Sequence, residues 1–188
     1  MRLKTKRIIC LHGGPGCGKS TTAHGLTYHL SLEGYTCEMN KEYIKDWVWE
    51  ERRPADGDQS YFFAKMSRKE RIYMAQNIDF IITDGPLILT HFYGIKYDRF
   101  EQKFNTSLSM LKNHHAICQE NGYKVDHFYL RRDIPYSPSG RYQTEEQAKV
   151  CDMEMEQMLK DMGISYKTVL ADMVCVSRII NEMEEDET

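Results

Sequence analysis

The sequence lacks any apolar run that could cross a membrane, since a spanning helix needs about 20 consecutive apolar residues. It also lacks the spacings of structural metal sites, because its six cysteines and seven histidines are scattered without a C-x-x-C pair. Basic residues occur among the first seven, but only four apolar residues follow them, which is too few for a signal peptide. We therefore expect a cytoplasmic protein with reduced thiols, no zinc site and no membrane partner.

A strong charge of either sign is absent as well. The formal net charge is −3, which excludes broad electrostatic attraction to nucleic acid, so any such binding must come from a local patch. The 188 residues suffice for a substantial core, and 41% hydrophobic with 28% charged residues is ordinary for a globular protein. We expect one domain over residues 1–188.

Strand and helix signals alternate along the chain. Apolar, β-branched segments predict strands, and apolar residues at steps of three and four predict helices. The expected strands are residues 7–12, 35–40, 79–84, 124–130 and 165–170. The expected helices are 19–32, 41–52, one begun by a capping box at 67–70, 100–118, one capped by Thr144 and Gln147, and one around 176–183. Segments 55–60 and 131–141 are expected to be loops.

Nearly continuous apolar strands separated by helices indicate an α/β fold, a parallel sheet with helices on both faces. Right-handed crossovers bring the carboxyl ends of such strands to one edge of the sheet, where ligands bind. The segments expected at this edge are 13–20, Glu38, Glu42, 84–86 and 131–133. The functional site is therefore predicted there.

The segment after the first expected strand is rich in glycine. Gly13, Gly18, Lys19 and Ser20 fit the pattern G-x-x-x-x-G-K-[ST], in the strand–loop–helix setting that this pattern requires. Its backbone N–H groups form an anion nest at the positive end of the next helix. Lys19 is expected to contact the β- and γ-phosphates of ATP, and the Ser20 hydroxyl a Mg²⁺ ion. The predicted binding residues for the triphosphate are Gly13, Gly14, Pro15, Gly16, Cys17, Gly18, Lys19, Ser20 and Thr21.

An acidic residue ends the third expected strand. Asp84 follows an apolar run beside the predicted phosphate-binding loop. A carboxylate in this place can hold Mg²⁺ directly or through water. It can instead be the base that accepts a proton from an attacking hydroxyl, and Glu38 is a second candidate for that base. The sequence leaves both assignments open.

Arginines gather in the loop after the fourth expected strand. Residues 129–143 include Arg131, Arg132 and Arg141 in a segment with two prolines and a glycine. A loop of this kind suits a lid that closes over the triphosphate, neutralises charge on the transferring phosphoryl group and excludes water. Arg132 and Arg141 are accordingly predicted to be catalytic. The alternative is that these arginines pair with acidic neighbours on the surface.

Three segments together resemble the NadR-like (AAA_28-type) branch of P-loop kinases, named for ribosylnicotinamide kinase. They are GGPGCGKSTT at residues 13–22, IITDGP at 81–86 and YLRRDIPYSPSGRYQ at 129–143. The branch's loop after strand four is similar to D-x-P-[WY]…G-x-R, which matches Asp133, Pro135, Tyr136, Gly140 and Arg141 here. Residues 38–43 resemble its E-Y-x-R-E-Y segment imperfectly. The resemblance implies a kinase and a five-stranded parallel sheet of order 2-3-1-4-5.

Similar small proteins of bacteriophages resemble kinases that phosphorylate hydroxymethyluracil bases in DNA, a step in thymidine hypermodification. This resemblance implies a DNA-base acceptor and the host cytoplasm as location. Between the second and third expected strands, aromatic residues interleave with cations, which suits stacking on a base and holding phosphate. These residues are Tyr43, Trp47, Trp49, Arg52, Arg53, Tyr61, Phe62, Phe63, Lys65, Arg68, Lys69 and Arg71. For Trp47 the alternative is a place in the core, and for Phe62 and Phe63 it is packing beneath the loop.

Three classes of function therefore remain. The first is a kinase that transfers the γ-phosphoryl group to a hydroxyl of a DNA base, or of a free nucleoside or nucleotide. The second is a P-loop ATPase switch, for which the chain has no room for an extra helical domain. The third is a nucleotide-binding module without turnover. The oligomeric state and the choice between ATP and GTP are not predicted.

Overall fold

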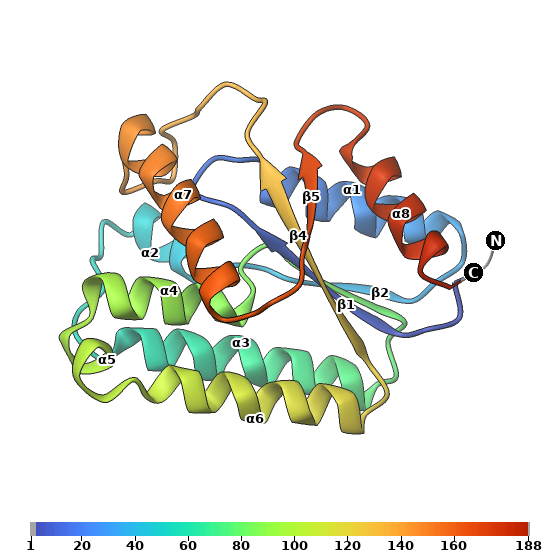
Figure 1. The fold of residues 1–188 in the computed structure, drawn as a ribbon, viewed down its shortest axis with the longest axis horizontal. Helices are drawn as coiled ribbons and strands as arrows, with labels where there is room; N and C mark the ends of the chain where they lie inside the picture. The colour runs from blue at the N-terminus through green and yellow to red at the C-terminus, as the bar shows by residue number, and fades with distance from the viewer. Residues whose placement is uncertain (1–2, 188) are drawn as a thin grey trace.

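The computed structural model describes residues 3–187. Its centre is a five-stranded parallel sheet, coloured from blue to red in Figure 1. The strands are β1 (Arg7–His12), β2 (Cys37–Asn40), β3 (Phe80–Thr83), β4 (Lys124–Arg131) and β5 (Lys167–Leu170). Their order is β2-β3-β1-β4-β5, and all four neighbouring pairs are parallel. The predicted fold class and strand order are confirmed.

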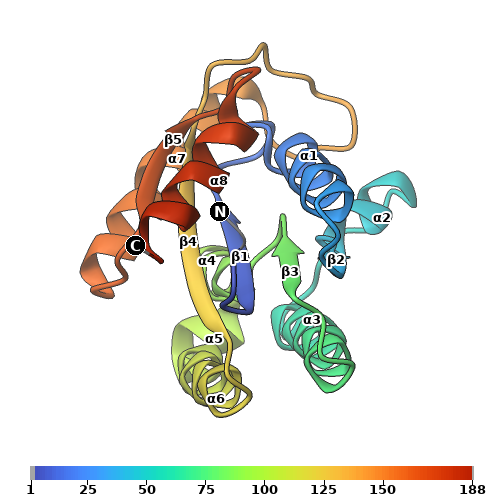
Figure 2. The ribbon, with the colours of Figure 1, turned by 90° about the vertical axis from the view of Figure 1, so that its right-hand side faces the viewer.

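Helices cover both faces of this sheet, as Figure 2 shows. They are α1 (Lys19–Leu32), α2 (Ile44–Trp49), α3 (Asp58–Ala75), α4 (Leu87–Tyr97), α5 (Arg99–Phe104), α6 (Thr106–Glu120), α7 (Glu145–Asp161) and α8 (Cys175–Glu185). Alternate residues of β1 face opposite layers, because successive side chains of a strand point to opposite sides. Ile9 and Leu11 pack with α1 and α8, whereas Ile8 and Cys10 pack with α3 and α6.

The expected start of a helix at the 67–70 capping box is wrong. Helix α3 already begins at Asp58, within the segment expected to be a loop, and Ser67 lies in its middle. Ser67 is buried. Glu70, the expected capping partner, instead contacts His114 Nε2 at 2.7 Å and accepts a hydrogen bond from Asn40 at 2.9 Å. These polar residues join α3 to α6 and to the end of β2, a tertiary role that mimics a capping pattern in the sequence.

The single helix expected over 100–118 is also wrong. The backbone turns at Asn105, where φ is 48°, and this turn separates α5 from α6. Phe100 and Phe104, two apolar residues in the first turns of the expected helix, are 55% and 58% exposed. Helix α4 carried no prediction, because it is apolar on nearly all sides and shows no amphipathic period; seven of its residues are buried. Among residues 3–187 no helix has both the length and the apolar character of a membrane span.

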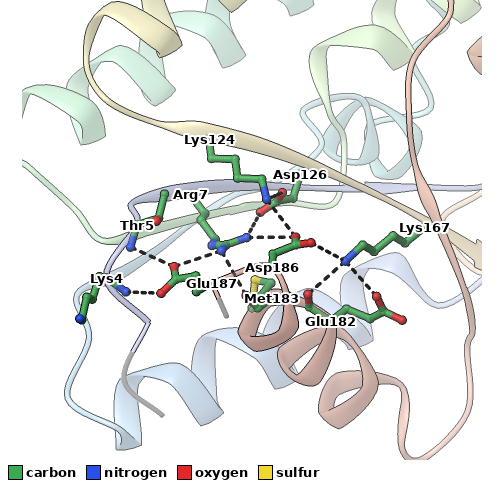
Figure 3. A network of polar contacts seen from close by, with 10 residues as sticks. All are labelled: Lys4, Thr5, Arg7, Lys124, Asp126, Lys167, Glu182, Met183, Asp186 and Glu187. Carbon is green, nitrogen blue, oxygen red and sulfur yellow. Dashed lines mark hydrogen bonds and ion pairs between the residues drawn. The ribbon is translucent and has the colours of Figure 1, made fainter.

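The two ends of the described chain are held together by the polar network in Figure 3. Arg7 is buried at the start of β1 and pairs with Asp126 Oδ2 at 2.7 Å and Glu187 Oε1 at 3.1 Å. Glu187 also accepts the backbone N–H groups of Lys4 and Thr5, at 2.8 and 3.0 Å. This network fastens the end of α8 to the strand that leads into the glycine-rich loop.

Acid is expected to release this network. Burial on its own would raise the pKa of Glu187, but the hydrogen bonds from Lys4, Thr5 and Arg7 lower it to about 2. A depressed folded-state pKa gives stability that is complete above the ordinary value of 4.5 and is lost as the pH falls towards 2. Glu187→Gln should lower Tm at pH 6 and should make the fall of Tm below pH 4.5 less steep than in wild type. In a domain of this size, each kcal/mol lost from the free energy of unfolding lowers Tm by about 2–4 °C. Thermal unfolding at pH 6, 4 and 3 measures both effects, and an unchanged pH dependence in the variant would contradict them.

Candidate active site

The glycine-rich loop, residues 13–18, joins β1 to α1 at the carboxyl edge of the sheet. Gly13, Gly16 and Gly18 have φ values of 133°, 74° and 99°, a region in which any other residue is strained. Gly13 has no space for a side chain either, since a Cβ there would lie 2.5 Å from Cys17 Sγ. The backbone therefore requires the glycines, and the loop ends at the amino terminus of α1, where the helix dipole favours an anion.

Lys19 lies beneath this loop. Its Nζ donates hydrogen bonds to the carbonyl oxygens of Gly13 and Gly14, at 2.6 and 2.9 Å. The side chain is buried, and within residues 3–187 no carboxylate forms an ion pair with it. Its further partner is Cys17 Sγ at 3.9 Å, and a buried cation whose hydrogen-bond partners are all neutral is a charge that a bound polyanion can compensate.

Asp84 lies just beyond the end of β3 and is buried. It links the start of α1 to the segment that follows β2. The Ser20 hydroxyl donates to its Oδ2 at 2.5 Å, and the backbone N–H of Glu42 donates to its Oδ1 at 2.9 Å. No group of three or more His, Cys, Asp or Glu side chains in the described chain could hold a metal ion alone. Mg²⁺ binds instead through one or two protein oxygens together with phosphates and waters. The oxygens of Ser20 and Asp84 fit this need.

Glu42 follows β2 and lines the cavity that opens beside the glycine-rich loop. It packs against Gly85, where an added Cβ would lie 2.7 Å from Glu42 Cβ, so the absence of a side chain at Gly85 makes room for it. Burial raises the pKa of Glu42 above its ordinary 4.5, and Asp84 adds to the rise, although Lys19 and Arg141 act against it. A carboxyl group with a raised pKa beside the cations of a phosphate site is a candidate base.

Glu38, the sequence-based candidate for the base, is placed elsewhere. It lies inside β2, opposite Ile81 in register, and its side chain is exposed. The strand continues to Asn40, so Glu42 rather than Glu38 reaches the carboxyl edge of the sheet. The structure therefore does not bring Glu38 to the other candidate residues.

A cavity of about 700 Å³ opens beside the loop. Predicted site residues on its wall are Pro15, Gly16, Gly18, Lys19, Ser20, Thr21 and Arg141. Gly13 and Gly14 are not on the wall, but their carbonyl oxygens accept hydrogen bonds from Lys19, which is. Asp84 is likewise one contact away, since it accepts hydrogen bonds from the wall residues Ser20 and Glu42. Cys17 is buried in the core next to Gly13.

The segment predicted to form a lid, residues 129–143, begins within β4, and its loop part from residue 132 onward forms one side of this cavity. Ile134 packs on Gly18, and Tyr136 on Gly16, close to the phosphate loop. At its other end Gly140 packs against Trp49, and the Tyr142 hydroxyl donates to the carbonyl of Arg52, so the lid touches the α2 region. Arg141 lines the cavity, and its Nε is buried without a partner in residues 3–187.

Arg132 takes a different position from Arg141. Its guanidinium donates to Asp152 on α7 and to the carbonyl oxygen of Pro15, at 2.9 Å in each case. It therefore contacts the loop backbone from outside the cavity wall.

The remaining wall combines predicted and unpredicted residues. Tyr43, Trp49, Arg53 and Phe62 come from the aromatic and basic set that the sequence suggested. Trp47 and Phe63 are buried and do not line the cavity, so both have a packing role instead. The lining residues that were missed include Gln59, Thr90, Tyr93 and Tyr97. Three of these lie on α4, and the helical signal that could have placed them was hidden by the uniformly apolar sequence of that helix.

The sheet order and the glycine-rich loop between β1 and α1 together define a P-loop nucleotide-binding fold with the topology of small kinases. The chain belongs to the AAA_28 family, whose model, described as an AAA domain, matches residues 8–174. No curated protein matches the chain significantly.

Two solved structures give the scale of the wider likeness. Deoxyadenosine kinase from M. mycoides, with dCMP and dCDP bound, has 15% identity and a TM-score of 0.54, over 95% of this chain and 99% of that one. NadR protein in complex with NR has 16% identity and a TM-score of 0.58, over 88% of this chain and 43% of NadR. At such identities the likeness shows the fold. The predicted P-loop family is confirmed, whereas the resemblance to phage hydroxymethyluracil kinases stays a prediction.

Proposed function

We propose that the protein is an ATP-dependent kinase that transfers a phosphoryl group to a hydroxyl of a nucleoside-like acceptor. The observation that carries the proposal is the shared cavity: Lys19 and Ser20 lie on the same wall as Glu42 and the aromatic residues Tyr43 and Phe62. Phosphoryl transfer depends on placing donor and acceptor together and stabilising charge. A cavity that is lined both by a phosphate loop and by aromatic rings meets both needs.

Each charged residue has a role in this proposal. Lys19 and Arg141 neutralise the charge of the polyphosphate, and Ser20 and Asp84 hold Mg²⁺. A Mg²⁺–ATP complex supplies the electrophilic γ-phosphorus when bound. The hydroxyl oxygen of the acceptor bonds to the γ-phosphorus while the bond to ADP breaks, and Glu42 accepts the proton of that hydroxyl. Asp84 is a poorer base, since both of its oxygens already accept hydrogen bonds from Ser20 and Glu42.

For the acceptor we propose the more specific form that the sequence suggested, a hydroxymethyluracil base in DNA. Support comes from the exposed face of α3, which carries Lys65, Arg68 and Arg71. In residues 3–187 no carboxylate forms an ion pair with any of the three. Lys65 lies over the rings of Tyr43 and Tyr61, at 5.7 and 5.4 Å from their centroids, and Tyr43 lines the cavity. When a base of a DNA strand enters the cavity, the phosphates of that strand can contact the cations on this face of α3.

Free nucleosides or nucleotides are the second candidate acceptors. The observation in their favour is the pair of similar structures, whose bound ligands are dCMP, dCDP and NR rather than nucleic acid. The net charge of −3 points the same way.

Labelled ATP distinguishes these acceptors. The protein is incubated with labelled ATP, Mg²⁺ and either an oligonucleotide containing hydroxymethyluracil or free nucleosides. The mass of each product is then measured by mass spectrometry. An added mass of about 80 Da on an acceptor, one phosphoryl group, establishes a kinase and names its acceptor class. Label found only in free phosphate would indicate an ATPase, and bound ATP without turnover a binding module; either result overturns the proposal.

Charge reversal on α3 is expected to separate the two acceptor types. The double variant Lys65→Glu/Arg68→Glu should raise KM for the oligonucleotide by at least about 10-fold and weaken its salt dependence, because two phosphate contacts are lost. KM for a free nucleoside should stay unchanged. The control Lys149→Glu/Lys160→Glu makes the same charge change on exposed positions of α7 and should affect neither. Equal KM values for the oligonucleotide in all three proteins would contradict the DNA form of the proposal.

A further inference from the structure

The carboxylate of Asp152, on α7, lies directly against the glycine-rich loop. Its Oδ1 accepts the backbone N–H of Gly14 at 2.5 Å. Its Oδ2 accepts hydrogen bonds from Nε and Nη2 of Arg132, at 3.1 and 2.9 Å. The same Nη2 donates to the carbonyl oxygen of Pro15 at 2.9 Å. One ion pair thus holds two consecutive residues of the loop, one through its N–H and the other through its carbonyl.

Helix α7 is shaped for this contact. Ala148, Asp152 and Met155 lie at steps of four and three, which places them on one face of the helix. A Cβ on Gly14 would lie 2.5 Å from Asp152 Oδ1 and 2.7 Å from the Ala148 carbonyl oxygen. The N–H of Gly13 donates to Met155 Sδ at 3.3 Å. The absence of a side chain at Gly14 therefore serves the approach of α7, although φ at this glycine is not positive.

The ion pair also fixes the orientation of Arg132. Its side chain is only 12% exposed, and that of Asp152 19%. With Nε and Nη2 engaged, Nη1 is buried without a partner in residues 3–187, 3.5 Å from where a Cβ on Gly16 would lie. Gly16 is on the cavity wall. The planar guanidinium has fixed donor directions, so the carboxylate at one edge determines where the other edge points.

We propose that Asp152 is a positioning residue, which holds the first half of the phosphate loop and fixes Arg132 with its remaining Nη1 beside Gly16 of that loop. This inference rests on the proposed kinase function for its catalytic readout. An arginine held by a neighbouring carboxylate loses less freedom when phosphate binds than an unrestrained one. Asp152 itself does not touch the reacting atoms.

The test uses Asp152→Asn, which keeps the size of the side chain. Gly14 and Arg132 donate to different oxygens of the carboxylate, and asparagine replaces one of these oxygens with an NH₂ donor, so one of the two contacts is lost. We expect kcat to fall about 10-fold or more, since a misplacement of ~1 Å can cost ~100-fold. KM for ATP should stay within about threefold of wild type or decrease, because the removal of a negative charge near the triphosphate favours its binding.

A double-mutant cycle then shows whether Asp152 acts through Arg132. Arg132→Gln is measured alone and together with Asp152→Asn, by phosphoryl transfer to the acceptor or, without one, to water. The double variant should be no slower than the slower single variant, which is the pattern of residues that act as a unit. Effects that multiply, or an Asp152→Asn enzyme with wild-type kcat, overturn the proposal.

Two further readouts do not need turnover. Titration with a fluorescent ATP analogue gives Kd for each variant, and thermal unfolding shows whether each is folded. Trypsin should cleave after Arg132 faster in Asp152→Asn than in wild type, with cleavage after Lys160 as the internal control, because Lys160 is already 54% exposed. If the wild type binds ATP but transfers no phosphoryl group, the proposed function fails. The positioning proposal is then decided by the cleavage rates, and equal rates overturn it.

Discussion

Replacing Lys19 with methionine is expected to lower kcat by roughly 10²–10³-fold, the effect of removing one charged donor from a transition state. The ammonium lies beneath the loop, where it donates hydrogen bonds to the carbonyl oxygens of Gly13 and Gly14 and contacts Cys17 Sγ. When a polyphosphate binds, this cation can exchange two neutral acceptors for anionic oxygens, which form stronger hydrogen bonds. Methionine is also unbranched and is only one atom shorter, so it fills most of the buried site while it removes the charge and the N–H donors, and the fold should persist.

Three measurements make this expectation decisive. Steady-state transfer from labelled ATP gives kcat, titration with a fluorescent ATP analogue gives Kd, and thermal unfolding confirms the fold. The matched control is Lys149→Met, which removes an exposed lysine of α7 and should leave all three unchanged. A Lys19→Met protein with wild-type kcat and Kd would mean that the loop does not bind the transferring phosphate, and the central assignment would be wrong.

The loop could be recognised from the sequence because its chemistry is local. Glycines at φ values forbidden to other residues, a lysine and a serine all lie within one short segment, and the strand and helix around it have clear patterns. The strand order came from the resemblance to a kinase family rather than from periodicity. Asp84 was found for a similar reason, since an acidic residue at the end of an apolar strand is visible without knowledge of tertiary contacts.

The rest of the site depends on contacts that the sequence does not display. Glu38 was preferred to Glu42 because the end of a short edge strand is poorly marked, and a shift of a few residues decides which side chain reaches the ligand. Tyr93 and Tyr97 were missed together with α4, whose uniformly apolar sequence hides its helical period. The ion pair of Arg132 joins residues 20 positions apart, and no local pattern connects a loop arginine to an aspartate on the next helix.

The largest expected effect on the chemical step belongs to Glu42→Gln. We expect kcat to fall by roughly 10²–10⁴-fold, the usual contribution of a general base. Glutamine preserves the shape beside Gly85 and the backbone N–H that Asp84 accepts, so Mg²⁺ binding should be retained. The dependence of the rate on Mg²⁺ concentration should therefore match wild type, whereas Asp84→Asn should shift it to higher concentrations. This comparison separates the base from the metal ligand, which the sequence left open.

The pH dependence carries the same test further. A base must be ionised to accept a proton, so the wild-type rate should fall as the pH is lowered through the pKa of Glu42. Burial raises that pKa above 4.5, with Asp84 contributing, and the acidic limb of the profile should accordingly begin at a higher pH than an exposed glutamate would give. In Glu42→Gln the residual rate should lose this limb. A variant that keeps both the limb and a near-normal kcat would transfer the role of base to Asp84 or to the acceptor itself, since Glu38 lies exposed within β2 and outside the cavity wall.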